Sequence, residues 1–89
     1  MGNIEHAIAE IKTLECPTSD IKGRVRGILR NHEIAHGTEI TVSRNHMLDK
    51  NGARGYSAKI TRDDGLTINV LAMSGMDDYV TKIIDAYRY

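Results

Sequence analysis

The chain of 89 residues contains no Trp, no Phe, one proline and one cysteine. Without the two bulkiest apolar side chains, the interior depends on Ile, Leu, Val, Met and four Tyr, which leaves little material to enclose a deep ligand cavity. The lone Cys16 excludes an intrachain disulfide. A hydrophobic content of 40% and a single proline are not the composition of a disordered chain. We therefore expect one folded domain over residues 1–89.

Long hydrophobic runs are also missing. No stretch reaches the length of the apolar region of a signal peptide or of a membrane-spanning helix. Together with the unpaired cysteine, this pattern predicts a cytoplasmic protein without a membrane partner.

The net charge is zero, but the charges are unevenly distributed along the chain. Residues 1–21 carry one lysine and four carboxylates, and residues 22–62 carry nine Lys or Arg and three carboxylates. Residues 63–89 carry two Lys or Arg and five carboxylates. A basic middle of this kind attracts the phosphates of nucleic acid or an acidic face of a partner protein. The alternative is that the acidic ends of the same chain neutralise it.

Apolar residues at helical spacing predict three helices. The first covers residues 3–14 with Asn3 as its N-cap, the second starts at Thr18 or Ser19 and continues to His36, and the third follows Ser74 and extends to the last residues. The apolar positions are Ile4, Ala7, Ile8, Ile11 and Leu14; Ile21, Val25, Ile28 and Leu29; and Met76, Tyr79, Val80, Ile83, Ile84 and Tyr87.

Between the second and third helices the apolar period changes to two, which predicts three strands at residues 38–44, 56–62 and 66–73. A turn-rich loop, residues 45–54, joins the first two strands, and Asp63-Asp64-Gly65 predicts a tight turn between the last two. The expected fold class is α+β, in the order α-α-β-β-β-α, with a three-stranded antiparallel meander sheet packed against helices.

Two glycines, Gly23 and Gly27, interrupt the second predicted helix. Each costs about 1 kcal/mol of helix propensity relative to alanine, so we expect a close approach to the helix backbone there. The approaching group is either the first helix, which is the interpretation we favour, or a phosphate.

From residue 18 onward the predicted order α-β-β-β-α resembles that of double-stranded-RNA-binding domains. The resemblance implies RNA binding through the helices and the loop between the first two strands, whose counterpart here is the basic loop 45–54. The chain departs from that family at the start of the last predicted helix, where Met76-Asp77-Asp78 stand in place of lysines that bind phosphate.

The segment His32-Glu33-Ile34-Ala35-His36 matches the H-E-x-x-H motif and resembles the zinc-binding helix of zincin peptidases. The resemblance implies that His32 and His36 are zinc ligands and that Glu33 is the catalytic base, because residues four apart on a helix point the same way. The third ligand would be His46, although Glu39, Asp63 and Asp64 also qualify chemically. The alternative is that both histidines cap the C-terminal end of the helix.

The leading interpretation is a small non-catalytic binding protein, of regulator or inhibitor type, that acts on nucleic acid or an acidic partner protein and needs no cofactor. Self-association is also compatible with it. The expected binding residues are Lys22, Arg26, Arg30, Arg44, Lys50, Arg54, Lys59 and Arg62. The alternative interpretation is a zinc-binding protein or minimal zinc hydrolase that uses His32, Glu33, His36 and His46.

Overall fold

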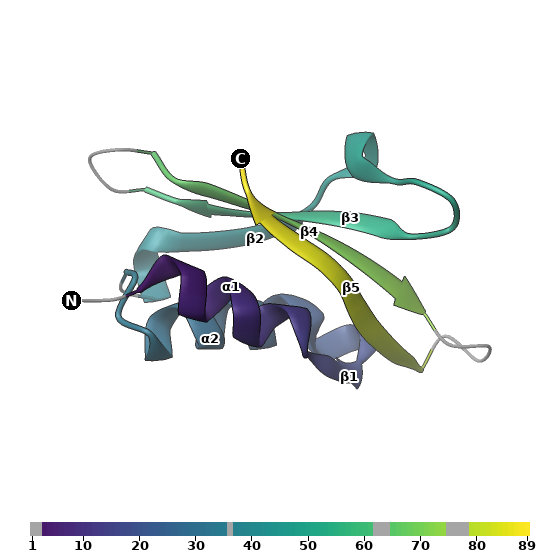
Figure 1. Ribbon diagram of the computed structural model, residues 1–89, viewed down its shortest axis with the longest axis horizontal. Helices are drawn as coiled ribbons and strands as arrows, with labels where there is room; N and C mark the ends of the chain where they lie inside the picture. Colours follow the sequence, from purple (N-terminus) through teal and green to yellow (C-terminus); the bar gives the residue numbers. More distant parts are fainter. Residues whose placement is uncertain (1–2, 36, 62–64, 75–78) are drawn as a thin grey trace.

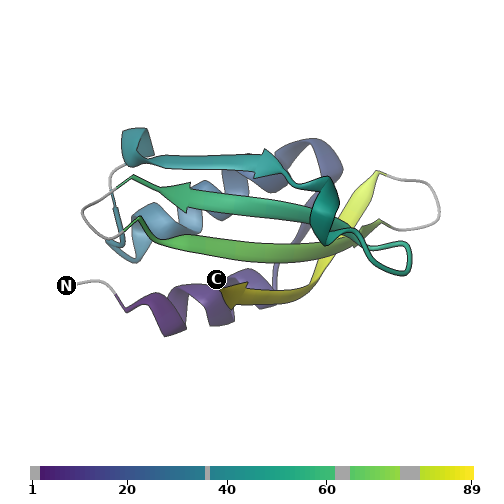
Figure 2. The same cartoon turned by 90° about the horizontal axis from the view of Figure 1, so that it is seen from above.

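The computed structural model describes residues 3–35, 37–61, 65–74 and 79–89. Two helices pack against one face of a five-stranded antiparallel sheet (Figures 1 and 2). No α-helix of the described residues packs on the opposite face, which we call the uncovered face. The molecule measures 39 × 23 × 21 Å. The two helices, α1 and α2, have nine and eleven residues, well short of the roughly 20 apolar residues that a membrane crossing requires.

Helix α1 (Ile4–Lys12) begins as predicted at Asn3, whose side chain accepts hydrogen bonds from the backbone N–H groups of Glu5 and His6. A short 3-10 turn, η1 (Thr18–Asp20), precedes α2 (Ile21–Asn31). The predicted apolar stripe of α2 is confirmed, because all four of its residues are buried.

Helix α2 ends at Asn31, well before the predicted end at His36. Glu33 has a backbone φ of 57°, and the N–H of Ile34 donates to the carbonyl of Leu29 at 3.1 Å. At about 100° per residue, a continuing helix would carry Ile34 off the buried stripe. The turn at Glu33 instead places Ile34 and Ala35 in the core.

The sheet consists of β1 (Glu15–Pro17), β2 (Ile40–Arg44), β3 (Arg54–Ile60), β4 (Thr67–Ser74) and β5 (Val80–Arg88). The strand order is β1-β5-β4-β3-β2, every neighbouring pair is antiparallel, and the sheet curls into a half-barrel (Figure 1). Two further 3-10 turns flank β2: η2 (Gly37–Glu39) precedes it and η3 (His46–Leu48) follows it.

The three predicted strands correspond to β2, β3 and β4. Ala58 and Ile60 on β3, and Ile68, Val70 and Ala72 on β4, are at most 1% exposed, which confirms that they face inward as predicted. They pack against the buried stripes of the two helices.

The predicted fold, a three-stranded sheet with a final helix, is wrong because the sheet has five strands and the chain ends in β5. The register between β4 and β5 shifts so that Leu71 pairs with Asp85 but Ala72 pairs with Ile83. Ile84 is therefore an extra residue on β5, which is a β-bulge.

The bulge removes the regular alternation by which this strand could be recognised. Buried side chains on β5 fall at Thr81, Ile83 and Ala86, so their spacing is two and then three. Of the predicted helical stripe on β5 only Ile83 is buried, and the exposed Val80, Ile84 and Tyr87 complete the i, i+3, i+4 apolar pattern on which the helix prediction rested. Without a final helix the chain also lacks the element order of double-stranded-RNA-binding domains, and Asp77 and Asp78 lie outside the described residues.

Strand β1 occupies the short segment between the two helices, to which the sequence analysis assigned no element. Its three residues pair with β5, placing Cys16 opposite Thr81, and Pro17 sits at the sheet edge where its missing N–H is tolerated. The hydroxyls of Thr18 and Thr81 are 2.7 Å apart just beyond this strand. Burial raises the pKa of the Cys16 thiol, and the smaller opposite effect of Arg24 does not cancel it. This keeps the thiol in its unreactive protonated form at neutral pH.

Candidate functional site

The outward side of α2 carries Lys22, Arg26 and Arg30 at intervals of four residues, and all three side chains are exposed. Four residues of helix rise about 6 Å, so the three cations form a line along the helix axis. Arg24 adds a fourth positive charge, and the helix sequence contains no acidic residue. We call Lys22, Arg26 and Arg30 the cationic row.

The cationic row has no carboxylate partner in the described part of the chain. The ion pairs found there join other residues, and none of the three side chains makes a hydrogen bond or ion pair with a described residue. Direct pairing with the acidic ends therefore does not neutralise these charges among the described residues.

Gly23 and Gly27 lie beside the cationic row. A Cβ atom added at either glycine would meet nothing within 4 Å outside its own helix turn, so the expected contact with the first helix is wrong. The helix backbone is thus accessible from outside next to three unpaired cations.

Arg44, in contrast, is held within the chain. Its Nη1 and Nη2 donate to the Asp49 carboxylate at 2.7 and 3.0 Å, Nη1 also donates to the Gly55 carbonyl at 2.9 Å, and the guanidinium lies 5.6 Å from the Tyr56 ring centre. The hydrogen bond from Arg44, assisted by the Gly55 N–H, holds the pKa of Asp49 well below its usual range. The same hydrogen bond raises the pKa of Arg44. Arg44 therefore fastens the loop after β2 to the sheet.

The remaining predicted binding residues do not join the cationic row. Lys50 lies in the loop after η3, Arg54 is the first residue of β3, and Lys59 projects from β3 on the uncovered face of the sheet. Arg62 lies outside the described residues. The predicted basic surface is thus divided between the helix layer and the opposite face of the sheet.

The described part of the H-E-x-x-H segment, residues 32 to 35, does not lie on a helix. His32 is the residue after the last turn of α2, and Glu33 has left-handed backbone geometry, so the helix on which the zinc-site prediction depends ends before Glu33. The His32 Nε2 lies 2.9 Å from Glu10 Oε1 and joins α2 to α1. His36 lies outside the described residues.

The proposed third ligand, His46, lies in η3, beyond the far end of β2. The five residues of β2 alone span roughly 16 Å, and the nearest acidic group to the His46 ring is Asp49, at 3.7 Å. Within the described ranges, no group of three His, Cys, Asp or Glu side chains is placed to hold a metal ion.

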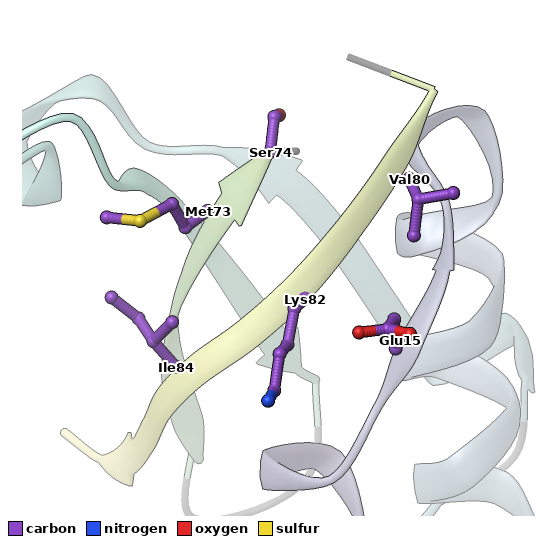
Figure 3. A pocket seen from close by; sticks show the side chains of 6 residues that line it. All are labelled: Glu15, Met73, Ser74, Val80, Lys82 and Ile84. Carbon is purple, nitrogen blue, oxygen red and sulfur yellow. The ribbon is translucent and has the colours of Figure 1, made fainter. Parts of the chain in front are cut away.

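Sequence reasoning missed a hollow of about 350 Å³ on the uncovered face, over β1, β5 and β4 (Figure 3). Met73 and Ile84 lie on one side of β5, and Lys82 and Glu15, which are cross-strand neighbours, lie between β5 and β1. Ile84 is 49% exposed. The sequence did not predict this surface, because the predicted helix placed Ile84 and Tyr87 in a buried stripe.

Exposed large apolar side chains are confined to one part of the described structure. They come from η3, β4 and β5 and the residues flanking β5, and α1 and α2 contribute none. These residues are Met47, Met73, Tyr79, Val80, Ile84, Tyr87 and Tyr89.

No protein-family model, curated protein or solved structure matches this chain.

Proposed function

We propose that this protein is a non-catalytic binding protein that attaches to a polyanionic partner, in the first place nucleic acid, through the cationic row on α2. The observation that carries the proposal is the set of three exposed cations that have no partner among the described residues, on a helix that has no acidic residue. Phosphates along a nucleic-acid strand release counterions when such cations bind, which drives association without sequence readout.

The two glycines of α2, where a Cβ would enter open space, support phosphate as the contacted group. With no Cβ at Gly23 or Gly27, a phosphate can approach the helix backbone beside the long side chains of Lys22, Arg26 and Arg30. Retaining two helix-weakening residues in open space brings no packing advantage inside this chain.

The experiment is fluorescence anisotropy with labelled single- and double-stranded oligonucleotides over a series of salt concentrations. If the three cations each contact a phosphate of duplex DNA, the plot of log affinity against log salt should have a slope of about −2.7. Affinity that does not change with salt would contradict nucleic-acid binding.

The test variant replaces Lys22, Arg26 and Arg30 with Gln. Its matched control replaces Lys12, Lys82 and Arg88, three exposed cations outside the basic middle, with Gln and so has the same net charge. We expect the test variant to lose binding and most of the salt slope, and the control to retain both. Equal losses in the two variants would show that net charge, and not α2, is responsible.

A partner protein is the second candidate, favoured by the apolar side chains on the uncovered sheet face and by the zero net charge of the chain. The measurement is recovery of a stoichiometric partner from nuclease-treated cell extract. Loss of the partner in the α2 variant would identify an acidic protein bound to α2. Loss only in a Met73→Ser, Ile84→Ser variant would place the partner on the sheet.

A further inference from the structure

A second hollow on the uncovered face, of about 420 Å³, lies where η3 stands above the sheet (Figure 1). Its floor includes Ser57 and Asn69, its walls include Met47, Leu48 and Tyr89, and Lys59 lies at its edge. Ser57 and Asn69 are 3% and 4% exposed, although they face away from the helix layer. They are thus polar groups enclosed beneath this hollow.

A chain of hydrogen bonds with a fixed direction leads across the floor. The Met47 N–H donates to Asn45 Oδ1 at 3.1 Å, Asn45 Nδ2 donates to Ser57 Oγ at 2.8 Å, and the Ser57 hydroxyl donates to Asn69 Oδ1 at 3.0 Å. The first bond caps η3 and fixes which end of the Asn45 carboxamide points to Met47. Each later bond takes its direction from the one before it.

The chain of donors ends at Asn69 Nδ2. Nδ2 makes no hydrogen bond to any residue that the structure describes, and its carboxamide lines the hollow. It is not sealed inside the protein, because no buried side-chain nitrogen or oxygen of the described residues lacks a partner. Because Nδ2 opens onto the hollow, a ligand acceptor that enters the hollow can take the hydrogen bond that water otherwise accepts.

The surroundings determine the chemistry of that acceptor. None of the described residues that line the hollow has an acidic side chain, and Lys59 contributes a positive charge from the strand next to Asn69, so an anionic acceptor is favoured. Met47, Leu48 and Tyr89 give the hollow an apolar side, and Met47 and Tyr89 are 95% and 88% exposed without an occupant. Apolar walls around a few polar donors are typical of small-molecule sites.

We propose that this hollow binds a small organic carboxylate with an apolar or aromatic body. The carboxylate accepts hydrogen bonds from Asn69 Nδ2 and Lys59 Nζ, and the apolar body packs against Met47, Leu48 and the Tyr89 ring. The site is separate from the cationic row on α2 and does not depend on the function proposed for it.

The test is an NMR titration of the labelled protein with benzoate and with benzyl alcohol, its uncharged counterpart. We expect benzoate to shift the Asn69 side-chain resonances saturably and benzyl alcohol to bind at least about tenfold more weakly, since hydrogen bonds to ionised acceptors are roughly twice as strong as neutral ones. The variant that lacks the α2 cations should bind benzoate unchanged.

Two variants and one control separate this site from a general charge effect. Lys59→Gln should weaken benzoate binding about three- to tenfold through loss of one charge-assisted hydrogen bond. Lys82→Gln, which removes a lysine elsewhere on the same face, should leave it unchanged. Asn69→Asp should abolish it, because the two N–H donors are replaced by a repelling charge while the Ser57 hydroxyl keeps its acceptor.

The proposal is overturned if benzoate causes no saturable shift at Asn69, if benzyl alcohol binds equally well, or if Lys82→Gln weakens binding as much as Lys59→Gln. If Asn69→Asp does not fold, the proposal is still tested by the comparison of the two lysine variants and by the shift at Asn69 in the unmodified protein.

Discussion

Arg44 and Asp49 form a bidentate pair in which two guanidinium nitrogens donate to the two carboxylate oxygens, at 2.7 and 3.0 Å. The Gly55 N–H donates to the same carboxylate at 2.7 Å. The pair joins the end of β2 to the residue after η3, and so holds η3 above the uncovered face. The sequence pattern placed Arg44 among the partner-binding residues, but the structure gives it a partner inside the chain.

The Arg44–Asp49 pair predicts how stability depends on pH. Because the pKa of Asp49 is lowered in the folded protein, its contribution to stability is complete above the unfolded-state pKa of about 3.9 and is lost as the pH falls toward the folded value. We therefore expect Asp49→Asn to lower the urea midpoint at neutral pH, by an amount that decreases below about pH 4. The measurement is urea unfolding followed by circular dichroism at a series of pH values.

Glu15→Gln provides the control for that experiment, because Glu15 is exposed and makes no ion pair with a described residue. The urea midpoint of Glu15→Gln should equal that of the unmodified protein at each pH value. A difference between Asp49→Asn and the unmodified protein that increases on acidification would contradict the role assigned to the pair.

Three glycines are predicted to respond to alanine in opposite directions. A Cβ at Gly55 would lie 2.5 Å from the Asn45 carbonyl oxygen and closer still to Leu48 Cβ, so Gly55→Ala should destabilise the protein by about 1–3 kcal/mol. At Gly23 and Gly27 a Cβ enters open space on a helix, and each alanine should stabilise by about 0.5–1 kcal/mol. Equilibrium denaturation measures the change in unfolding free energy for all three variants. A Gly55→Ala variant as stable as the unmodified protein would contradict the close approach of η3 to β3.

Neighbouring isoleucines on β5 distinguish a bulged strand from a helix. Ile83 is 1% exposed and Ile84 is 49% exposed. Ile83→Ala should therefore cost about 2–5 kcal/mol, and Ile84→Ala only about 0.5 kcal/mol, as for a surface substitution. Both positions belong to the apolar stripe of the helix predicted for this segment, so comparable losses at the two sites would favour that helix over the strand.

Features encoded within a few consecutive residues could be predicted from the sequence. Asn3 caps α1 because its side chain reaches N–H groups two and three residues ahead. The buried stripe of α2 and the alternation on β3 and β4 follow from helical and strand periods. The cationic row was visible for the same reason, since Lys22, Arg26 and Arg30 are neighbours on one helix.

The existence of strands β1 and β5 could be learned only from the tertiary structure, because it depends on residues far apart in the chain. Strand β1 exists because β5 offers it a hydrogen-bonding edge, and β5 is a strand because β4 accepts it with one extra residue at Ile84. A bulge interrupts the two-residue period of a strand, and a three-residue strand is too short to show a period.

The end of the H-E-x-x-H helix was decided in the same way. Burial of Ile34 and Ala35 against the rest of the core favours a turn at Glu33, although the preceding apolar stripe could continue through His32 and His36. The partners of Arg44 and the free donor of Asn69 likewise appear only when β2, η3, β3 and β4 are assembled. Local periodicity determined which residues face inward on most elements, but pairing and burial between distant segments determined where the elements end and which polar groups remain available to a ligand.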